Sequence, residues 1–326
     1  MFETLDGLYT EFTGWLFELA IQPLLYAIGA MDWAEDAYNW LDFFLFGLLQ
    51  IVVIMAVCWP LEQWKPVERW KTRSVVWTDV FYTVLSSLGL LPLIAFVLLY
   101  SAEERIFGWI ADSGFIPPTI EEFLPWLRDW PLVALAIYVV ILDFGEYWRH
   151  RFQHTIPWWW ALHSVHHAQK QMTYWTDARN HIIDDAIAAV WFGVIALAIG
   201  VPPGQFPVIV MLLKVIEALS HANARISFGW LGERLVVSPR FHRVHHGILS
   251  YGEHGKNYAV LMPVWDWMFR TANFDRSRYP ETGDPTAPEA LVTGGWLRQQ
   301  WAGSVRLWRA LTKRRRPATA KPVAGN

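Results

Sequence analysis

Two copies of one histidine pattern stand out in the sequence: "HSVHH" at residues 163–167 and "HRVHH" at residues 242–246. They hold six of the eleven histidines, and every histidine lies between His150 and His254. A lone histidine is usually an ordinary polar residue, but a repeated His-x-x-His-His pattern is typical of metal ligation. The pattern therefore makes a metal site the first functional hypothesis.

The spacing within each copy predicts convergence on a helix. Residues three and four apart share one helix face, within about 5–6 Å of each other. A further pair, His150 and His154, has the same four-residue spacing. One zinc or iron ion rarely takes more than three or four protein nitrogens. Eight convergent imidazoles therefore predict two metal ions, bound by His150, His154, His163, His166, His167, His242, His245 and His246.

Further candidates lie near these histidines. His221 ends an apolar segment and is a candidate ninth ligand, while His181 and His254 could bind metal, support the ligands or lie on the surface. An acid precedes several histidines by one helical turn, and such carboxylates often hold the second nitrogen of a ligand. These acids are Glu146 before His150, Asp177 before His181 and Glu217 before His221, although Glu217 could equally pair with Lys214.

The donor set limits the metal and its chemistry. The single cysteine, Cys58, excludes both an intrachain disulfide and a thiolate cluster. Imidazole favours iron, zinc or copper, and an apolar surround favours oxygen chemistry. Two ferrous ions with O2 can break an unactivated C–H bond, while the protein holds the metals, excludes water and positions the substrate.

The elements that carry these residues are predicted to be membrane helices. Hydrophobic residues make up 54% of the 326-residue chain and charged residues only 17%. Apolar stretches of spanning length are expected at 12–31, 41–60, 79–100 and 131–148, with a shorter helical pair at 186–201 and 205–219. No alternating strand pattern is present. The fold class expected is an all-α, polytopic membrane bundle with a helical cap that carries the histidines.

The distribution of charge predicts how the chain lies in the membrane. Residues 61–75 carry four Lys or Arg, residues 301–326 carry seven, and residues 101–130 hold six acids against two bases. By the positive-inside rule, residues 61–75, the histidine clusters and the C-terminus are expected to face the cytoplasm. The N-terminus is acidic and lacks the features of a cleaved signal.

The sequence also predicts three regions. Residues 1–75 hold N-terminal membrane helices, residues 76–275 form the histidine-bearing core, and residues 276–326 form a basic tail. In that tail Leu297, Trp301, Val305, Trp308 and Leu311 recur at helical spacing among basic residues, which indicates an amphipathic helix on an anionic leaflet. A nucleic-acid partner is not expected.

The motifs together resemble the fatty acid hydroxylase / sterol desaturase superfamily. The resemblance covers residues 143–271 and rests on Asp143-Phe144-x-x-Tyr147-Trp148-x-His150, the two pentads, Arg179-x-His181, His221-Ala222-Asn223, Asn257-Tyr258 and Trp265-Asp266. It adds Asp143, Asn223, Asn257 and Asp266 to the residues expected to support the metal site. Three residues depart from the family pattern without removing a ligand: Ile182, Ala259, and Arg270 where a glycine usually precedes the closing threonine.

The resemblance implies a non-haem diiron enzyme that acts on a membrane lipid with O2. Hydroxylation of an acyl chain or sterol is favoured, and sterol C-4 methyl oxidation or sterol or carotenoid desaturation is the alternative. No dinucleotide fingerprint, haem attachment motif or iron–sulfur cysteine set is present. An external electron donor is therefore expected, a ferredoxin or a cytochrome b5 type of protein with its reductase.

Two functions of other classes compete with an oxygenase. A metal transporter would place ionisable residues along a path through its spans, and Lys214 with Glu217 is the only clear pair. A membrane metalloprotease would need His-Glu-x-x-His, which is absent. Zinc could occupy the site in purified protein, since imidazoles bind zinc at least as well as ferrous iron.

Overall fold

The chain folds into helices joined by loops. The structure is a computed structural model that describes residues 2–91, 105, 108–109, 112–116, 118–200, 206–248, 255–275 and 277–312. No β-strand occurs among these residues, which confirms the all-α prediction. The helices of the first half are α1 (Phe2–Leu16), η1 (Phe17–Ile21), α2 (Gln22–Ala27), η2 (Met31–Trp33), α3 (Ala34–Trp64), α4 (Val76–Ser87), α6 (Ile120–Phe123) and η3 (Pro125–Asp129).

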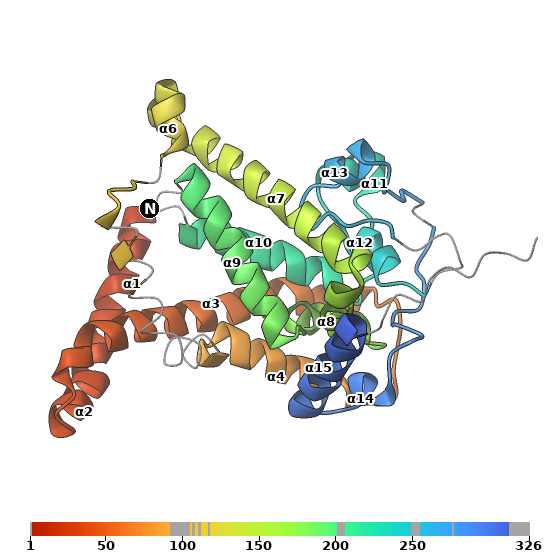
Figure 1. Cartoon of the computed structure of the whole chain (residues 1–326), viewed down its shortest axis with the longest axis horizontal. Helices are drawn as coiled ribbons and strands as arrows, with labels where there is room; N and C mark the ends of the chain where they lie inside the picture. Colours follow the sequence, from red (N-terminus) through yellow and green to blue (C-terminus); the bar gives the residue numbers. More distant parts are fainter. Residues whose placement is uncertain are drawn as a thin grey trace, which may run out of the picture.

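The second half carries the histidines and forms one end of the bundle. Its helices are α7 (Pro131–Thr155), α8 (Pro157–His167), η4 (Tyr174–Ala178), α9 (Ile182–Ile199), α10 (Phe206–His221), α11 (Gly229–Leu235), α12 (Pro239–His245), α13 (Val264–Met268), α14 (Glu289–Val292) and α15 (Trp296–Thr312). Helix α9 packs on α7, and α10 packs on α3 and α12. Figure 1 shows α6 at one end of α7 and the short helices α8 and α12 at the other.

Among the residues that the structure describes, three segments are long and apolar enough to cross a membrane: Met31–Trp64, Pro131–Thr155 and Ile182–Ile199. They contain the expected spans 41–60 and 131–148, and they show that residues 186–199 belong to a helix of spanning length. The turn expected at 202–204 and the end of the expected span 79–100 lie outside the described residues. Membrane helices are thus confirmed by length and composition.

The expected span 12–31 is not one continuous α-helix. Residues Phe17–Ile21 form a π-helical turn between α1 and α2, and Pro23 stands at the second position of α2. A proline has no N–H and favours the first turn of a helix, so it is compatible with a new helical segment beginning there. Figure 1 shows α1 and α2 at the far side of the molecule from α8 and α12.

Two glycines let the site-bearing helices approach each other. A Cβ on Gly145 of α7 would lie 2.5 Å from the Ile195 side chain of α9, and one on Gly303 of α15 would lie 2.5 Å from the His181 ring. Real Cβ atoms essentially never come this close, so a larger residue at either position would force the facing Ile195 side chain or His181 ring to shift. Helix α15 packs along α8 in this way, and its exposed face carries Leu297, Trp301, Trp308 and Leu311.

Candidate metal centre

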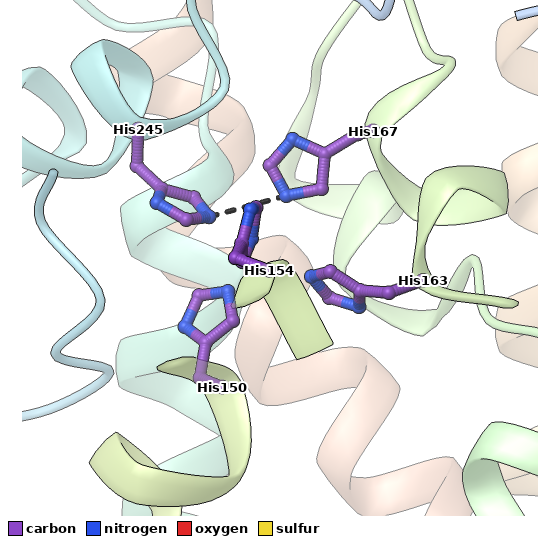
Figure 2. Close-up of side chains that lie close together, drawn as sticks. All are labelled: His150, His154, His163, His167 and His245. Atoms are coloured by element: carbon purple, nitrogen blue, oxygen red, sulfur yellow. Dashed lines mark hydrogen bonds between the residues drawn. The ribbon is translucent and has the colours of Figure 1, made fainter. Parts of the chain in front are cut away.

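Nine histidines converge into two adjacent groups. Within each group, one ring nitrogen of every member lies within 4.8 Å of the others. The larger group joins the end of α7 to α8 and α12, and its five rings surround a common centre in Figure 2. The rings of His167 and His246 stack across the two groups at 4.2 Å. The larger group is His150, His154, His163, His167 and His245; the smaller is His166, His221, His242 and His246.

Helix ends and short helices position these side chains. His150 and His154 occupy the last two turns of α7, and His221 is the last residue of α10. Helix α8 starts at Pro157 directly after α7 ends. Helix α12 starts at Pro239, and the Ser238 hydroxyl accepts a hydrogen bond from the Phe241 N–H. Because proline favours the first turn and serine the N-cap, the sequence itself fixes where these two helices begin.

Three histidines are held by backbone carbonyls. The Nδ1 atoms of His150, His221 and His245 lie 2.7, 2.7 and 2.9 Å from the carbonyl oxygens of Tyr258, Glu217 and Lys256. A carbonyl oxygen only accepts, so each Nδ1 carries the proton and each Nε2 presents a lone pair. Ligands of metal ions are commonly fixed by this kind of contact. The Nε2 atoms of His245 and His221 indeed face other imidazole nitrogens, at 3.1 Å from His167 and His166.

Several other imidazole nitrogens of the two groups are buried and have no hydrogen-bond partner among the described residues. Among the described residues, His154 Nε2 and both ring nitrogens of His163 are buried without a hydrogen-bond partner. A buried unsatisfied polar atom costs about 1–3 kcal/mol, which a bound cation would recover. Burial lowers the pKa of His163, His166 and His167 of α8 well below the usual range, and that of His245 to about 4. Neutral imidazoles are the ligand form, so the two groups fit metal ions.

The acids one turn before the histidines pair with basic side chains, whereas they were expected to hold the second nitrogen of a ligand. Glu146 is bonded to Arg149, with oxygens 2.7 and 2.5 Å from its guanidinium nitrogens. The Glu217 carboxylate accepts from Lys214 Nζ at 2.6 Å, the pairing that the sequence left open. Asp177 lies 3.4 Å from Lys214 Nζ and 3.8 Å from His221 Nδ1. Charged pairs therefore flank the histidines, and backbone carbonyls rather than these carboxylates hold them.

The other polar residues of the motifs shape the loop that supplies two of those carbonyls, Tyr258 and Lys256. Asp143 accepts from the backbone N–H groups of Leu261 and Met262 and from the Trp265 indole, at 2.7–3.1 Å. Asp266 accepts from the N–H groups of Tyr258 and Ala259, at 2.9 and 2.7 Å. Asn257, at φ 60°, donates to the Phe241 carbonyl at 2.9 Å. These three residues fix residues 256–262 against α7 and α12, and none of the three belongs to either histidine group.

The remaining candidates lie outside both groups. The Asn223 side chain binds the backbone of Glu68: its Oδ1 accepts from the Glu68 N–H, and its Nδ2 donates to the Glu68 carbonyl. The backbone N–H of Asn223 donates to the Glu62 carboxylate. His181 lies 2.9 Å from the Gln300 carbonyl through Nε2, and its Nδ1 accepts from the Ile183 N–H at 3.2 Å. It therefore caps α9 and holds α15. His254 lies outside the described residues.

The structure shows contacts near the site for residues to which the sequence analysis assigned no role. Asp184 lies 3.5 Å from His163 Nδ1 and accepts from Gln153 and the Trp159 indole. Asp79 and Arg179 form a fully buried ion pair at 2.7 Å, and Arg179 also donates to the Val165 carbonyl of α8. Arg179 stood in a motif without an assigned role. Nothing in the sequence pairs it with Asp79, one hundred positions away.

A cavity of about 540 Å³ opens onto the histidines, a size typical of small-molecule sites. It lies among α7, α9 and α10, and five histidines from the two groups line it: His150, His163, His166, His221 and His242. Its other walls include charged side chains beside the histidines and apolar side chains such as Leu142, Phe192 and Ile209.

Comparison with known proteins agrees with this site. The family model described as "Fatty acid hydroxylase" matches residues 135–271. The chain is 31% identical to an alkylglycerol monooxygenase of Danio rerio over 193 residues, 32% to that of Homo sapiens over 148, and 28% to the ornithine lipid hydroxylase OlsE of Rhizobium tropici over 227. These matches cover 59%, 45% and 68% of this chain, and 40%, 32% and 65% of the relatives, less than two thirds of each. No solved structure matches.

The fold and the site define an all-helical protein with candidate membrane helices and two histidine groups that could hold metal ions. Residues 135–271 match the model of the fatty acid hydroxylase family, which agrees with the resemblance found in the motifs.

Proposed function

We propose that this protein is a membrane-bound dimetal oxygenase that hydroxylates, or desaturates, an unactivated C–H bond of a lipid. The observation that carries the proposal is the opening of one cavity onto histidines of both groups beside membrane-length helices. The names of the relatives, a monooxygenase and a lipid hydroxylase, support the reaction class. An acyl chain or a sterol is the substrate favoured.

The nine histidines are proposed to hold two iron ions, one in each group. With O2 and electrons, such ions supply an oxidant strong enough to remove hydrogen from an alkyl carbon. The protein does the rest. The carbonyls of Tyr258, Glu217 and Lys256 orient three imidazoles, and the burial of the clusters excludes water from the reacting carbon.

Electrons and substrate are proposed to arrive from outside the chain. The described residues and the sequence contain no thiolate cluster, because Cys58 is the only cysteine and is buried. A ferredoxin or a cytochrome b5 type of donor with its reductase fits this requirement. The proposed organisation keeps residues 1–75 as membrane helices, 76–275 as the catalytic core and 276–326 as the basic tail, with the histidine end in the cytoplasm.

The proposal is tested by metal content and product together. Purified protein is expected to bind about two irons per chain, and His163→Ala is expected to lose both iron and product. Trp301→Ala, on the exposed face of α15, is the matched control and should keep both. Lipid extracts of a host with and without the gene should differ by one oxygen for hydroxylation or two hydrogens for desaturation. Full iron retention in His163→Ala would count against the site.

Zinc in the purified protein would not show which metal the protein uses for its reaction, because imidazoles bind both zinc and ferrous iron. Activity is therefore measured after reconstitution with ferrous iron and a reductant. Uptake of metal by proteoliposomes, without any lipid product, would instead favour the transporter.

A further inference from the structure

Helix α3 buries a single face, and that face ends in a carboxylate. Ile54 and Cys58 pack in one apolar cluster with Ala218 of α10 and with Ala222, the residue that follows His221. Figure 1 shows α3 running from the side of α1 towards the end of the molecule that carries α8 and α12. The buried residues of α3 lie three or four positions apart, the spacing of one helix face: Gly47, Gln50, Ile54, Cys58 and Glu62.

Glu62, at the end of this face, holds the chain that leaves His221. Its Oε1 atom accepts the backbone N–H of Asn223 at 2.9 Å and the backbone N–H of Tyr174 at 3.0 Å. Tyr174 begins η4, which also carries Asp177, at 3.8 Å from His221 Nδ1. The Glu62 side chain is buried, so its removal would leave two N–H groups without their acceptor. Glu62 therefore fixes the end of α10 and the turn packed against it.

Glu68 extends this support to the second pentad. Its backbone N–H and carbonyl bind the Asn223 side chain at 3.1 and 2.8 Å. Its carboxylate forms an ion pair at 2.8 Å with Arg243, whose side chain is almost completely buried. Arg243 follows His242 directly and lies within residues 242–246 of the pentad. One acid beyond α3 thus contacts both chain segments that carry histidines of the smaller group.

The two histidine groups rest on different parts of the chain. Carbonyls of the loop at residues 256–262 hold two members of the larger group. The smaller group instead has three members in segments that are bonded to residues 62–68, namely His221, His242 and His246. Residues 62–68 precede residues 135–271, which the family model matches. The matched region therefore does not contain the support of the smaller group.

From these contacts we propose that Glu62 and Glu68 are positioning residues for the smaller histidine group, so that the metal ion held there depends on α3. Partners that orient metal ligands commonly change metal affinity by about ten- to hundredfold when they are removed. The larger group does not use this support, and its ion is independent of it. The inference rests on the metal centre of the proposed function and does not depend on the reaction carried out there.

Metal binding without turnover tests the support of each group by itself. The metal-free full chain in detergent is titrated anaerobically with Co2+, and the visible absorption of the bound ion is recorded. His154→Ala removes a ligand of the larger group and His221→Ala one of the smaller, so each variant reports the opposite group. We expect Glu62→Ala to weaken Co2+ binding by about tenfold or more in the His154→Ala protein. In the His221→Ala protein it should change the affinity by less than about twofold.

A conservative variant separates positioning from a general loss of stability. Glu62→Gln should keep most of the affinity, because its amide oxygen still accepts both N–H groups. Glu68→Ala frees Arg243 and should show the same selectivity as Glu62→Ala, which it replaces if that variant does not fold. Glu35→Ala, at an exposed position in the first turn of α3, is the matched control and should affect neither group. Equal weakening of both groups, or no weakening of the smaller one, would overturn the inference.

The two proposals can fail separately. Absence of lipid product from the iron-loaded protein would refute the oxygenase and leave the selective effect of Glu62 on Co2+ binding as it stands. Lipid product combined with an equal effect of Glu62→Ala on both groups would leave the oxygenase intact and refute the support by α3.

Discussion

At the scale of single residues, the histidines differ in what holds their outer nitrogen. Carbonyls of residues 217, 256 and 258 hold His221, His245 and His150, while His154 and His163 have buried nitrogens without a partner among the described residues. Helical spacing predicted which imidazoles share a face, since that depends only on the positions three and four apart. It could not predict the carbonyl contacts, because residues 256–258 reach the site through a loop fixed by Asp143 and Asp266.

Removal of one histidine from the smaller group should separate the two metals. His221 belongs to the group of four, and the group of five does not use it. We therefore expect His221→Ala to bind about one iron per chain instead of about two, with no turnover. Iron content by mass spectrometry, normalised to protein, measures this. Loss of all the iron would mean that the groups bind as one unit, and loss of none would remove His221 from the ligands.

Arg270 occupies a backbone conformation that suits glycine. Its φ is 60°, at the position where the family pattern usually has glycine before the closing threonine. A non-glycine residue in this region costs about 1–2 kcal/mol, partly offset by the greater freedom of glycine in the unfolded chain. Arg270→Gly should therefore raise the free energy of unfolding by up to about 1 kcal/mol, seen as a higher melting temperature in detergent. The same change at exposed Arg309 inside α15 should lower it, and equal effects would refute the explanation.

At the scale of elements, the contacts that set α8 in place are long-range. Histidine spacing and apolar stretches predicted helices here, and these predictions hold for the described residues. The ion pair between Asp79 of α4 and Arg179 joins segments one hundred positions apart, and local pattern carries no information on such pairing. The same limit applies to α15, whose basic apolar repeat was visible in the sequence, whereas its packing on α8 through Gly303 was not.

Removal of one partner of this pair should destabilise the histidine end of the molecule. Asp79 and Arg179 are both fully buried, and Asp79 also accepts from Gln169 and Thr176. Because Asp79→Ala leaves a buried guanidinium uncompensated, we expect a loss of about 3–5 kcal/mol in the free energy of unfolding. Thermal unfolding in detergent measures it. Asp275→Ala breaks an exposed pair with Arg278 and should cost less than about 1 kcal/mol, so similar losses in the two variants would exclude a special role for the buried pair.

The contact between α9 and α15 through His181 should depend on pH. Burial lowers the pKa of the His181 imidazole, whose Nδ1 accepts the Ile183 N–H. In the unfolded chain the pKa is about 6.5. Below that value the unfolded state takes up a proton that the folded state binds less well, so stability falls as the pH falls. Wild-type protein should lose more melting temperature between pH 7.5 and 5.5 than His181→Gln. An equal loss in the two proteins would show that His181 does not titrate in this way.

At the scale of the whole molecule, helix α7 runs from an acidic segment to the histidine end. Helix α7 is about 37 Å long, from its 25 residues, which is enough to cross the apolar part of a bilayer. The acidic segment 101–130 precedes it, and the histidines lie at its other end, at the level where Figure 1 shows α8 and α12. The fold and the apolar helices agree on a membrane protein. Which end faces the cytoplasm still follows from charge alone, through the excess of Lys and Arg in 61–75 and in the tail.

Single cysteines on the two sides should settle this orientation. Cys58, the only native cysteine, is fully buried and leaves an unlabelled background for a membrane-impermeant maleimide. Lys71 and Glu122 are both exposed; Lys71 lies before α4, and Glu122 lies in α6, before α7 begins. In intact cells Glu122→Cys should label and Lys71→Cys should not, whereas in inside-out vesicles the pattern should reverse. Labelling of Lys71→Cys in intact cells would place the histidine end outside, where a cytoplasmic electron donor could not reach it.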